Sequence, residues 1–384
     1  MLKRIIASIL ALMLIFSFAA CNREKKPTEE IVASEKKVAI LVAPEAQYPE
    51  DYRAAAALAA EYPDKVVIKE YSDSRVLKPG DPQIMVLSRE LANDSEIGAI
   101  IYARATQFTA NAINAAKDIN PELVTVCVEP EENVEKIASL ANLVLCADWA
   151  EYGKAIVAQA KAQGAEYFVM FSFTRHLNEN PLIASQQVAI KAACEEQGIT
   201  FAYENSLDPT FSGGFSQAEL FIRESVARLN LNERIKGENV VLYSTDSAVQ
   251  STLIDVANSK GYIYVSPSFP SAYNGLGEYY EIAMPEDKTD IAAYIENAKT
   301  AAAGGEGKAR LAIYNYPLAT TLVKSALHCT FDILNGKTTS ENMAERVAMR
   351  VTDASVGDTL TVKAYSDKLT NVYAAYSSGY VTVK

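Results

Sequence analysis

Short continuous apolar runs alternate with longer stretches of helical period along most of this chain, and this rhythm is the strongest constraint on its fold. The run KVAILVA at 37–43 is typical of a strand that is buried on both faces of a parallel sheet. Five such runs, separated by four helical stretches, end at NLVLCAD (142–148), and the same rhythm restarts with WAEYGKAIVAQAKAQG. The alternation predicts an α/β fold of two doubly wound, Rossmann-like lobes.

A hinge between the lobes follows from this arrangement. We expect the N-terminal lobe to comprise residues 38–147 plus about 285–336, and the C-terminal lobe residues 148–284 plus about 340–384. A late strand (ARLAIYN) and a late helix (PLATTLVKSALHCTFDILNGK) are predicted to return to the first lobe. The chain then crosses the hinge more than once, which permits rigid-body closure. The stretch 345–365 is predicted to be β-structure.

The first 36 residues differ from the rest of the chain. Lys3 and Arg4 precede an apolar stretch that ends at residue 20, which is shorter than the roughly 20 residues of a spanning helix and typical of a secretory signal. Ala19 and Ala20 precede Cys21 in a pattern that resembles a bacterial lipobox. We therefore predict a signal peptide at 1–20, lipidation of Cys21 and a flexible, charged tether at 21–36. An ordinary signal peptide or a retained helix are the alternatives.

Composition limits the possible partners and chemistry. The formal net charge is -12, and loss of Lys3 and Arg4 with the signal makes it -14, which argues against binding to nucleic acid or to anionic lipid. Membrane contact is expected through the lipid anchor only. The four remaining cysteines lack C-x-x-C spacing and are expected to be buried thiols, with one disulfide left open. Two histidines leave little material for a zinc site or a catalytic triad, so we predict no cofactor, metal or enzyme activity.

Five segments are similar to one family of bacterial lipoproteins. They are FVMFSFTRHL, ACEEQGITF, NSLDPTFSGG, VVLYSTDSAVQSTLI and SFPSAYNGLGEYYEI. The family is functionally uncharacterised, has a periplasmic binding protein type 1 fold, and several members are encoded near ABC-transporter components. The resemblance covers most of residues 38–340, although Thr174 and Thr245 stand where the family pattern has Pro and Asn. It implies a two-lobed binding protein and no particular ligand.

Polar side chains follow several predicted strands of the first half. Because the carboxyl ends of parallel strands face the crevice of an open α/β sheet, we expect them near a ligand. Arg104, Thr106 and Gln107 follow IGAIIYA, and Glu129 ends the next strand. Arg104 suits a carboxylate or phosphate, with a surface or interlobe salt bridge as the alternative. Glu129 either contacts the ligand or is a solvated loop charge.

The second half offers a similar group. Ser172 lies near the end of EYFVMFSF, and Thr174, Arg175 and His176 follow that run. A cation beside an imidazole suits an anionic or polyhydroxylated ligand. Alternatively, Arg175 pairs with a neighbouring carboxylate and His176 caps the following helix.

Four further candidates lie later in the chain. Asp208 either contacts the ligand or begins a turn with Pro209. Asp246 either accepts hydroxyl hydrogen bonds, as in sugar-binding proteins of the type 1 fold, or serves as a helix N-cap. Tyr273 and Asn274 suit stacking on a ring, or belong to a loop that packs on the other lobe.

These features predict a solute-binding protein on the extracytoplasmic face of the cell membrane. It would capture a small polar ligand of the sugar, nucleoside or amino-acid derivative class and present it to an ABC permease. A ligand sensor of the same fold that signals to a membrane receptor is the alternative. A gene regulator would need a DNA-binding headpiece where this chain has a signal and tether, and an enzyme would need a poised nucleophile or acid–base pair.

Overall fold

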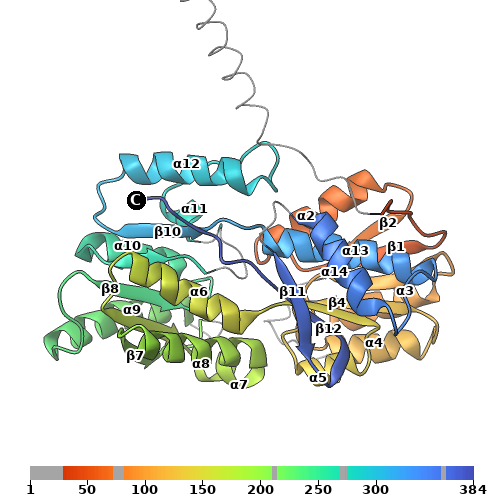
Figure 1. The fold of residues 1–384 in the computed structure, drawn as a ribbon, viewed down its shortest axis with the longest axis horizontal. Helices are drawn as coiled ribbons and strands as arrows, with labels where there is room; N and C mark the ends of the chain where they lie inside the picture. Colours follow the sequence, from red (N-terminus) through yellow and green to blue (C-terminus); the bar gives the residue numbers. More distant parts are fainter. Residues whose placement is uncertain (1–28, 72–81, 210–213, 268–272, 274, 356–359) are drawn as a thin grey trace, which may run out of the picture.

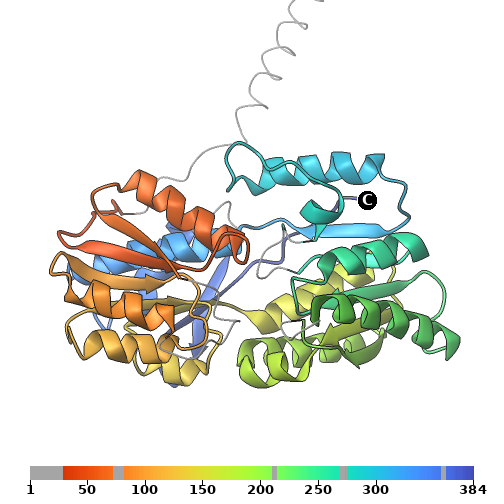
Figure 2. The ribbon, with the colours of Figure 1, turned by 180° about the vertical axis from the view of Figure 1, so that it is seen from behind.

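Two α/β lobes lie side by side in the computed structural model, which describes residues 29–71, 82–209, 214–267, 273, 275–355 and 360–384 (Figures 1 and 2). The first lobe is built on a seven-stranded sheet of order β11-β12-β5-β4-β3-β1-β2. Its elements are β1 (Lys37–Val42), α2 (Pro49–Glu61), β2 (Val66–Glu70), α3 (Gln83–Asn93), β3 (Ile97–Tyr102), α4 (Thr109–Lys117), β4 (Val124–Val128), α5 (Val134–Ala138), β5 (Leu143–Ala147), α13 (Leu318–Leu334), α14 (Met343–Ala354), β11 (Thr361–Ser366) and β12 (Leu369–Tyr376).

The second lobe is built on a six-stranded sheet of order β13-β10-β9-β8-β6-β7. Its elements are α6 (Trp149–Ala162), β6 (Tyr167–Ser172), α7 (Thr174–Glu179), α8 (Pro181–Glu196), β7 (Thr200–Asn205), α9 (Gly214–Leu231), β8 (Val240–Ser244), α10 (Gln250–Lys260), β9 (Ile263–Val265), α11 (Leu276–Tyr279), α12 (Ile291–Gly304), β10 (Arg310–Tyr314) and β13 (Tyr380–Thr382). Among the strands that the structure describes, only β11 and β13 pair antiparallel with a neighbouring strand. The predicted pair of doubly wound lobes is confirmed.

Burial on both faces explains why the strands read as continuous apolar runs. In β1 every residue from Val38 to Val42 is buried. The helices cover both faces, since α2 and α14 pack against α13 while α3 packs against α4. Because helices cover both faces of the sheet, a polar side chain on either face of a strand would be buried. These strands are therefore apolar on both faces and show no alternation of polar and apolar residues.

The lobe boundaries differ from the predicted ones at the C-terminal end of the chain. The helix α12 and the strand β10 belong to the second lobe, because β10 pairs parallel with β9 and extends that sheet. The hairpin β11–β12 belongs to the first lobe, where β12 pairs parallel with β5. Only α13 returns to the first lobe as expected, and only β13 of the last stretch lies in the second sheet.

The prediction of β-structure over 345–365 is wrong for its first part, which is the helix α14. The apolar residues Met343, Val347 and Val351 recur every four positions and put one face of the helix against α13. The β-branched content of this segment suggested strand, but packing of the helical face prevails over propensity.

The chain crosses between the lobes three times within the described residues, before α6, after β10 and after β12. Hydrogen bonds connect the three crossings. The Tyr314 hydroxyl donates to the Ser377 carbonyl (3.1 Å), and the Ser377 N–H donates to the Tyr152 hydroxyl (3.3 Å). The two tyrosine hydroxyls lie 2.5 Å apart. The hinge is therefore a set of mutually bonded segments, which favours motion of each lobe as a rigid body.

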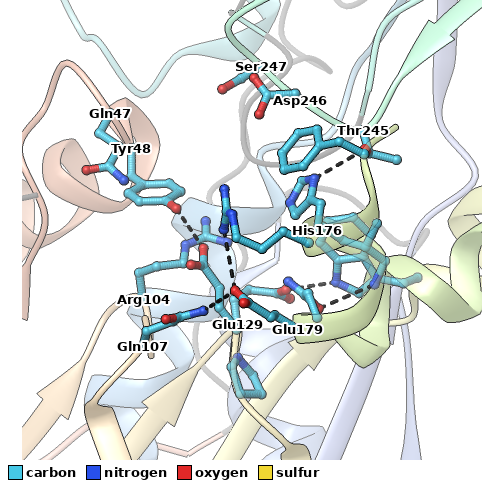
Figure 3. A pocket seen from close by; sticks show the side chains of 17 residues that line it. Gln47, Tyr48, Arg104, Gln107, Glu129, His176, Glu179, Thr245, Asp246 and Ser247 are labelled. Carbon is cyan, nitrogen blue, oxygen red and sulfur yellow. Dashed lines mark hydrogen bonds and ion pairs between the residues drawn. The ribbon is translucent and has the colours of Figure 1, made fainter. Parts of the chain in front are cut away.

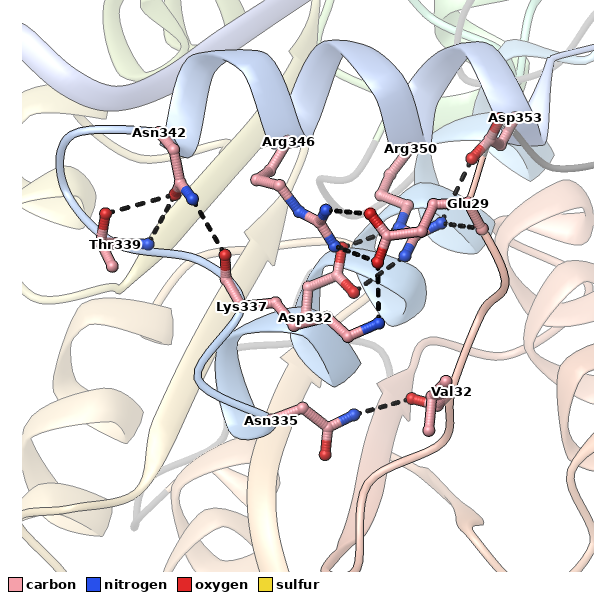
Figure 4. A network of polar contacts seen from close by, with 10 residues as sticks. All are labelled: Glu29, Val32, Asp332, Asn335, Lys337, Thr339, Asn342, Arg346, Arg350 and Asp353. Carbon is pink, nitrogen blue, oxygen red and sulfur yellow. Dashed lines mark hydrogen bonds and ion pairs between the residues drawn. The ribbon is translucent and has the colours of Figure 1, made fainter.

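Residues 29–35 dock on the first lobe, although they belong to the predicted flexible tether (Figure 4). The Glu29 carboxylate accepts hydrogen bonds from Lys337 (2.8 Å) and Arg346 (2.5 Å), and its carbonyl accepts one from Arg350 (2.7 Å). The Asn335 amide donates to the Val32 carbonyl (2.8 Å). The part of the predicted tether that the structure describes is thus held against the first lobe.

Two further predictions concern the thiols and the membrane. Cys127, Cys146, Cys194 and Cys329 are all buried and free, as expected, and burial raises the pKa of each thiol. In the described part of the chain we find no helix with the length and apolar character to span a bilayer. The predicted signal peptide and the predicted lipidation site, Cys21, lie outside the described residues.

Candidate functional site

A pocket of about 120 Å³ lies between the lobes, where the carboxyl ends of strands from both sheets meet (Figure 3). In each sheet the strand order reverses at one point, between β1 and β3 in the first and between β6 and β8 in the second. The lining follows β1, β3, β4 and β5 in the first lobe and β6 and β8 in the second. It comprises Gln47, Tyr48, Arg104, Gln107, Glu129, Pro130, Glu131, Trp149, Phe173, Arg175, His176, Glu179, Asn180, Ile183, Thr245, Asp246 and Ser247. Such reversal points are the usual ligand sites of open α/β sheets.

Arg104 dominates the first-lobe side. Its side chain is 3 % exposed and pairs with Asp51 (2.9 Å), while its guanidinium lies 4.5 Å from the centroid of the Tyr48 ring. Burial raises the pKa of Asp51 to about 6, and the Arg104 cation opposes this rise. Arg104 thus forms a buried salt bridge within its own lobe, and not the surface or interlobe salt bridge that was the alternative, and it also lines the pocket.

Glu129 adopts a left-handed backbone conformation (φ 47°) directly after β4 and is 2 % exposed. Such a conformation costs a non-glycine residue about 1–3 kcal/mol and is concentrated at functional sites. The Trp149 indole N–H donates to the carboxylate (2.9 Å), and so does the Ala147 backbone N–H. Burial raises the pKa of Glu129 to about 7, although the Arg104 cation and these two donors lower it. Glu129 is therefore a fixed, buried carboxyl group rather than a solvated loop charge.

Arg175 is the corresponding cation of the second lobe. It makes two hydrogen bonds to Asp208 (2.6 and 3.2 Å), approaches Glu179 (3.5 Å) and lies 5.3 Å from the centroid of the Phe173 ring. Its side chain remains 34 % exposed, whereas that of Asp208 is 7 % exposed. Asp208 thus holds the guanidinium in place while Arg175 faces the pocket.

His176 stacks on Phe173, with ring centroids 4.9 Å apart, and its Nδ1 lies 3.2 Å from the Thr245 hydroxyl. Thr245 in turn shares a hydrogen bond of 2.6 Å with Ser172. Burial and the neighbouring Arg175 cation lower the pKa of His176 to about 4. The imidazole is therefore neutral at physiological pH.

The two lobes touch across the pocket. The Gln107 amide donates to the Glu179 carboxylate (2.7 Å), which joins α7 to the loop after β3. At another interlobe contact, the Arg53 guanidinium lies 5.8 Å from the centroid of the Tyr273 ring. Direct contacts between side chains of the two lobes thus bridge the cleft at these points.

The structure brings six of the residues that the sequence placed near a ligand together in the pocket, and they are Arg104, Gln107, Glu129, Arg175, His176 and Asp246. Ser172 and Asp208 do not line the pocket but contact residues that do, Thr245 and Arg175 respectively. Thr106 is buried beside Tyr71. Tyr273 packs edge-on against Tyr294 of its own lobe (4.4 Å), and its ring contact with Arg53 of the first lobe is in line with the interlobe alternative. Asn274 lies outside the described residues.

Two of the alternative roles are wrong. Asp246 is not the N-cap of α10, because Val249 occupies that position, and the Asp246 side chain instead accepts a hydrogen bond from the Ala248 N–H (2.8 Å). His176 does not cap α8, because the Asn180 side chain accepts hydrogen bonds from Leu182 and Ile183 at that helix start. Both side chains are thereby left at the pocket.

Sequence reasoning missed the aromatic and acidic residues that complete the lining. The sequence pattern assigned Trp149 to a helix, and it is the first residue of α6. It also lies two residues after the end of β5, so the rule that strand ends face the crevice could have identified it. Glu179 reaches the pocket because Thr174–Glu179 form a short separate helix, α7, that the sequence did not suggest. Tyr48 lies six residues beyond β1, so the strand-end rule does not reach it.

The pocket chemistry is that of polar recognition. Carboxylates, guanidiniums, amides and aromatic rings line it, which suits hydrogen bonding and stacking to a small polar molecule. Outside the undescribed segments, no group of three or more His, Cys, Asp or Glu side chains is placed to hold a metal ion.

Solved structures share this architecture. A Clostridium difficile 630 protein described as a transcriptional regulator has a TM-score of 0.69 and 17 % identity, over 91 % of this chain and 100 % of that chain. An ABC transporter solute-binding protein from Clostridium phytofermentas with bound L-rhamnose has a TM-score of 0.51 and 12 % identity, over 91 % and 96 %. One from Agrobacterium vitis with bound allitol has a TM-score of 0.51 and 11 % identity, over 80 % and 92 %. The expected two-lobed periplasmic binding protein type 1 fold is confirmed.

Sequence comparison identifies the family. A Treponema pallidum (strain Nichols) protein called uncharacterized is 28 % identical over 215 residues, which are 56 % of this chain and 96 % of that protein. Residues 36–312 match the family model described as Protein of unknown function (DUF3798), and the chain belongs to this family.

Proposed function

We propose that this chain is a lipid-anchored, extracytoplasmic solute-binding protein that delivers a small polar solute to an ABC permease by closing its cleft. The observation that supports this most is the pocket itself, which strand-end side chains of both lobes line together. A ligand held there contacts both lobes at once, so it binds the closed state better than the open one. Only such a difference in affinity couples binding to closure.

The ligand contacts that we propose are Arg104, Glu129, Arg175, His176 and Asp246, with Ser172 and Asp208 acting through their partners. Proteins of similar fold hold L-rhamnose and allitol, which are polyhydroxylated molecules. The polar and aromatic lining of this pocket suits the same broad class. We assign the chain no enzymatic activity.

Thermal unfolding of the full chain in mild detergent, with a panel of sugars, polyols, nucleosides and amino-acid derivatives, tests the binding role. A ligand at a hundredfold excess over Kd stabilises the native state by about 2.7 kcal/mol. We expect Arg175→Ala to abolish that shift, because the guanidinium faces the pocket. Arg228→Ala is the matched control, since Arg228 also pairs with a carboxylate (2.5 Å to Glu204) but does not line the pocket. An unchanged shift in Arg175→Ala would remove this residue from the site.

Cys21→Ser tests the anchor. Radiolabelled palmitate should label the wild-type protein in bacterial cells and should not label the variant, because the thiol is the acceptor. Retention of the label in Cys21→Ser would contradict the anchoring.

A ligand sensor is the second candidate, because the fold is shared with a protein described as a transcriptional regulator. In the sensor, the closed form would contact a membrane receptor instead of a permease. Loss of solute uptake on deletion of the gene favours transport, whereas a changed transcriptional response with normal uptake favours sensing.

A further inference from the structure

The lining of the interlobe pocket carries more negative than positive charge among the described residues. Its carboxylates are Glu129, Glu131, Glu179 and Asp246, and its guanidiniums are Arg104 and Arg175. Each guanidinium also pairs with a carboxylate that is not part of the lining, Asp51 in the first lobe and Asp208 in the second. His176 adds no charge, because burial and Arg175 lower its pKa to about 4. Burial raises the pKa of Glu129 to about 7, so this group is only partly ionised at neutral pH, but the other three carboxylates still outnumber the two guanidiniums. An anionic solute would therefore meet a repulsive field in this pocket, and a cationic solute an attractive one.

Among these four carboxylates, Glu129 is the best suited to bind a positively charged group of a ligand. It is buried, whereas Glu131 and Asp246 are half-buried and Glu179 is exposed. A charge attracts its counterion more strongly where water is excluded. Its backbone is held in the left-handed region, and its side chain is fixed by donors from Ala147 and Trp149. The fold thus maintains a strained, oriented carboxyl group in the pocket wall.

Aromatic rings of the pocket already accommodate cations. The Arg104 guanidinium lies over Tyr48, and the Arg175 guanidinium lies over Phe173. Trp149, the third aromatic residue of the lining apart from His176, donates its indole N–H to Glu129 and so places its ring beside that carboxylate. A carboxylate next to an indole is a favourable environment for an ammonium or guanidinium group, because the ring face also attracts positive charge.

We propose that the solute taken up in this cleft carries a positively charged amine or guanidine group that pairs with Glu129. This rests on the proposed solute-binding function and specifies its substrate class as polar, amine-bearing molecules such as amino sugars or polyamines. When the cation enters, it favours the ionised form of Glu129, whose pKa burial otherwise raises to about 7. Binding near neutral pH therefore releases protons from this carboxyl group.

Matched sets of probes test the charge preference in thermal unfolding of the full chain at pH 7. One set is glucosamine, glucose and glucuronate, a second is galactosamine, galactose and galacturonate, and a third is putrescine, butane-1,4-diol and succinate. Spermidine and agmatine extend the amine group. We expect a rise in melting temperature from at least one amine and none from its neutral or acidic counterpart.

The variant Glu129→Gln assigns the effect to this residue, with Glu135→Gln as the control because Glu135 is exposed on α5 and does not line the pocket. We expect Glu129→Gln to bind the stabilising amine about thirtyfold more weakly or worse, and Glu135→Gln to bind as the wild type. Calorimetry in phosphate and in Tris should show proton release for the wild type and none for Glu129→Gln, which a purely structural role of Glu129 would not produce.

The outcomes separate the two proposals. Stabilisation by a neutral or acidic member equal to that by its amine overturns the charge preference and leaves the solute-binding function intact. Absence of stabilisation by every compound of all three classes overturns both. Amine binding that survives in Glu129→Gln, with unchanged proton release, overturns the pairing with Glu129.

Discussion

Asp332→Ala should lower the free energy of unfolding of the first lobe by about 3–5 kcal/mol, the cost of leaving a buried charge without its partner. Asp332 is 1 % exposed and accepts two hydrogen bonds from Arg350 (2.7 and 2.9 Å), whose side chain is fully buried. Arg346 approaches the same carboxylate (2.7 Å). Removal of Asp332 leaves two guanidinium groups with fewer acceptors, that of Arg350 fully buried and that of Arg346 13 % exposed. Asp353 (3.2 Å) and the Glu29 carbonyl (2.7 Å) compensate Arg350 only in part.

Urea unfolding followed by circular dichroism measures this loss. The control is Glu233→Ala, which breaks an exposed pair with Lys236 (3.0 Å) and should cost no more than about 1 kcal/mol. Hydrogen exchange gives a second readout, because Arg346 and Arg350 also bind Glu29, so residues 29–35 should exchange faster in Asp332→Ala. A cost equal to that of the control would contradict the importance of the buried pair.

His328→Leu should become more stable relative to the wild type as the pH falls. His328 lies in α13, is 1 % exposed, and has no hydrogen-bond partner on either ring nitrogen within the described chain. Burial lowers its pKa from 6.5 to about 3, assisted by Lys324 and Arg350 and opposed by Asp353 and Asp332. The unfolded chain thus binds the proton first, so the contribution of His328 to stability is lost as the pH drops below about 6.5.

The size of this effect follows from the linkage relation. Between pH 7.5 and pH 4.5 the wild type should lose about 2.7 kcal/mol through His328, and His328→Leu should not. Asp51 and Glu129 have raised pKa values and oppose this trend, but they are present in both proteins and cancel in the comparison. His328→Gln, which is polar and does not titrate, should behave as His328→Leu does. A stability difference that is constant over this pH range would contradict the prediction.

The pattern of apolar residues predicted most strands and helices, because the burial of each element determines which of its own residues are apolar. The runs that became β1, β4 and β5 are apolar throughout since helices cover both faces of the sheet. Which sheet a strand joins depends on pairing between distant segments, such as β12 with β5, and no local period records that choice. For this reason the late elements were assigned to the wrong lobes.

The site was predictable where a side chain follows its strand directly. Arg104, Glu129 and Arg175 lie within three residues of a strand end, so the topology alone places them at the cleft. Tyr48 and Glu179 reach the pocket through loop and helix geometry, which depends on tertiary packing. Pairing of Arg175 with a neighbouring carboxylate was one of two predicted alternatives, without the partner being named. In the structure the partner is Asp208, and the same guanidinium also lines the pocket.

If Cys21 carries a lipid, as we propose, the docking of Glu29 beside α13 and α14 limits the distance between the first lobe and the bilayer. The chain from Cys21 to Glu29 spans at most about 29 Å when fully extended. With Cys21 inserted in lipid, as we propose, the first lobe stays close to the bilayer. Opening of the cleft then moves the second lobe relative to the first lobe and to the membrane. A permease that receives the solute from this protein would then have to bind it at a site that the first lobe can reach within about 29 Å of the anchored cysteine.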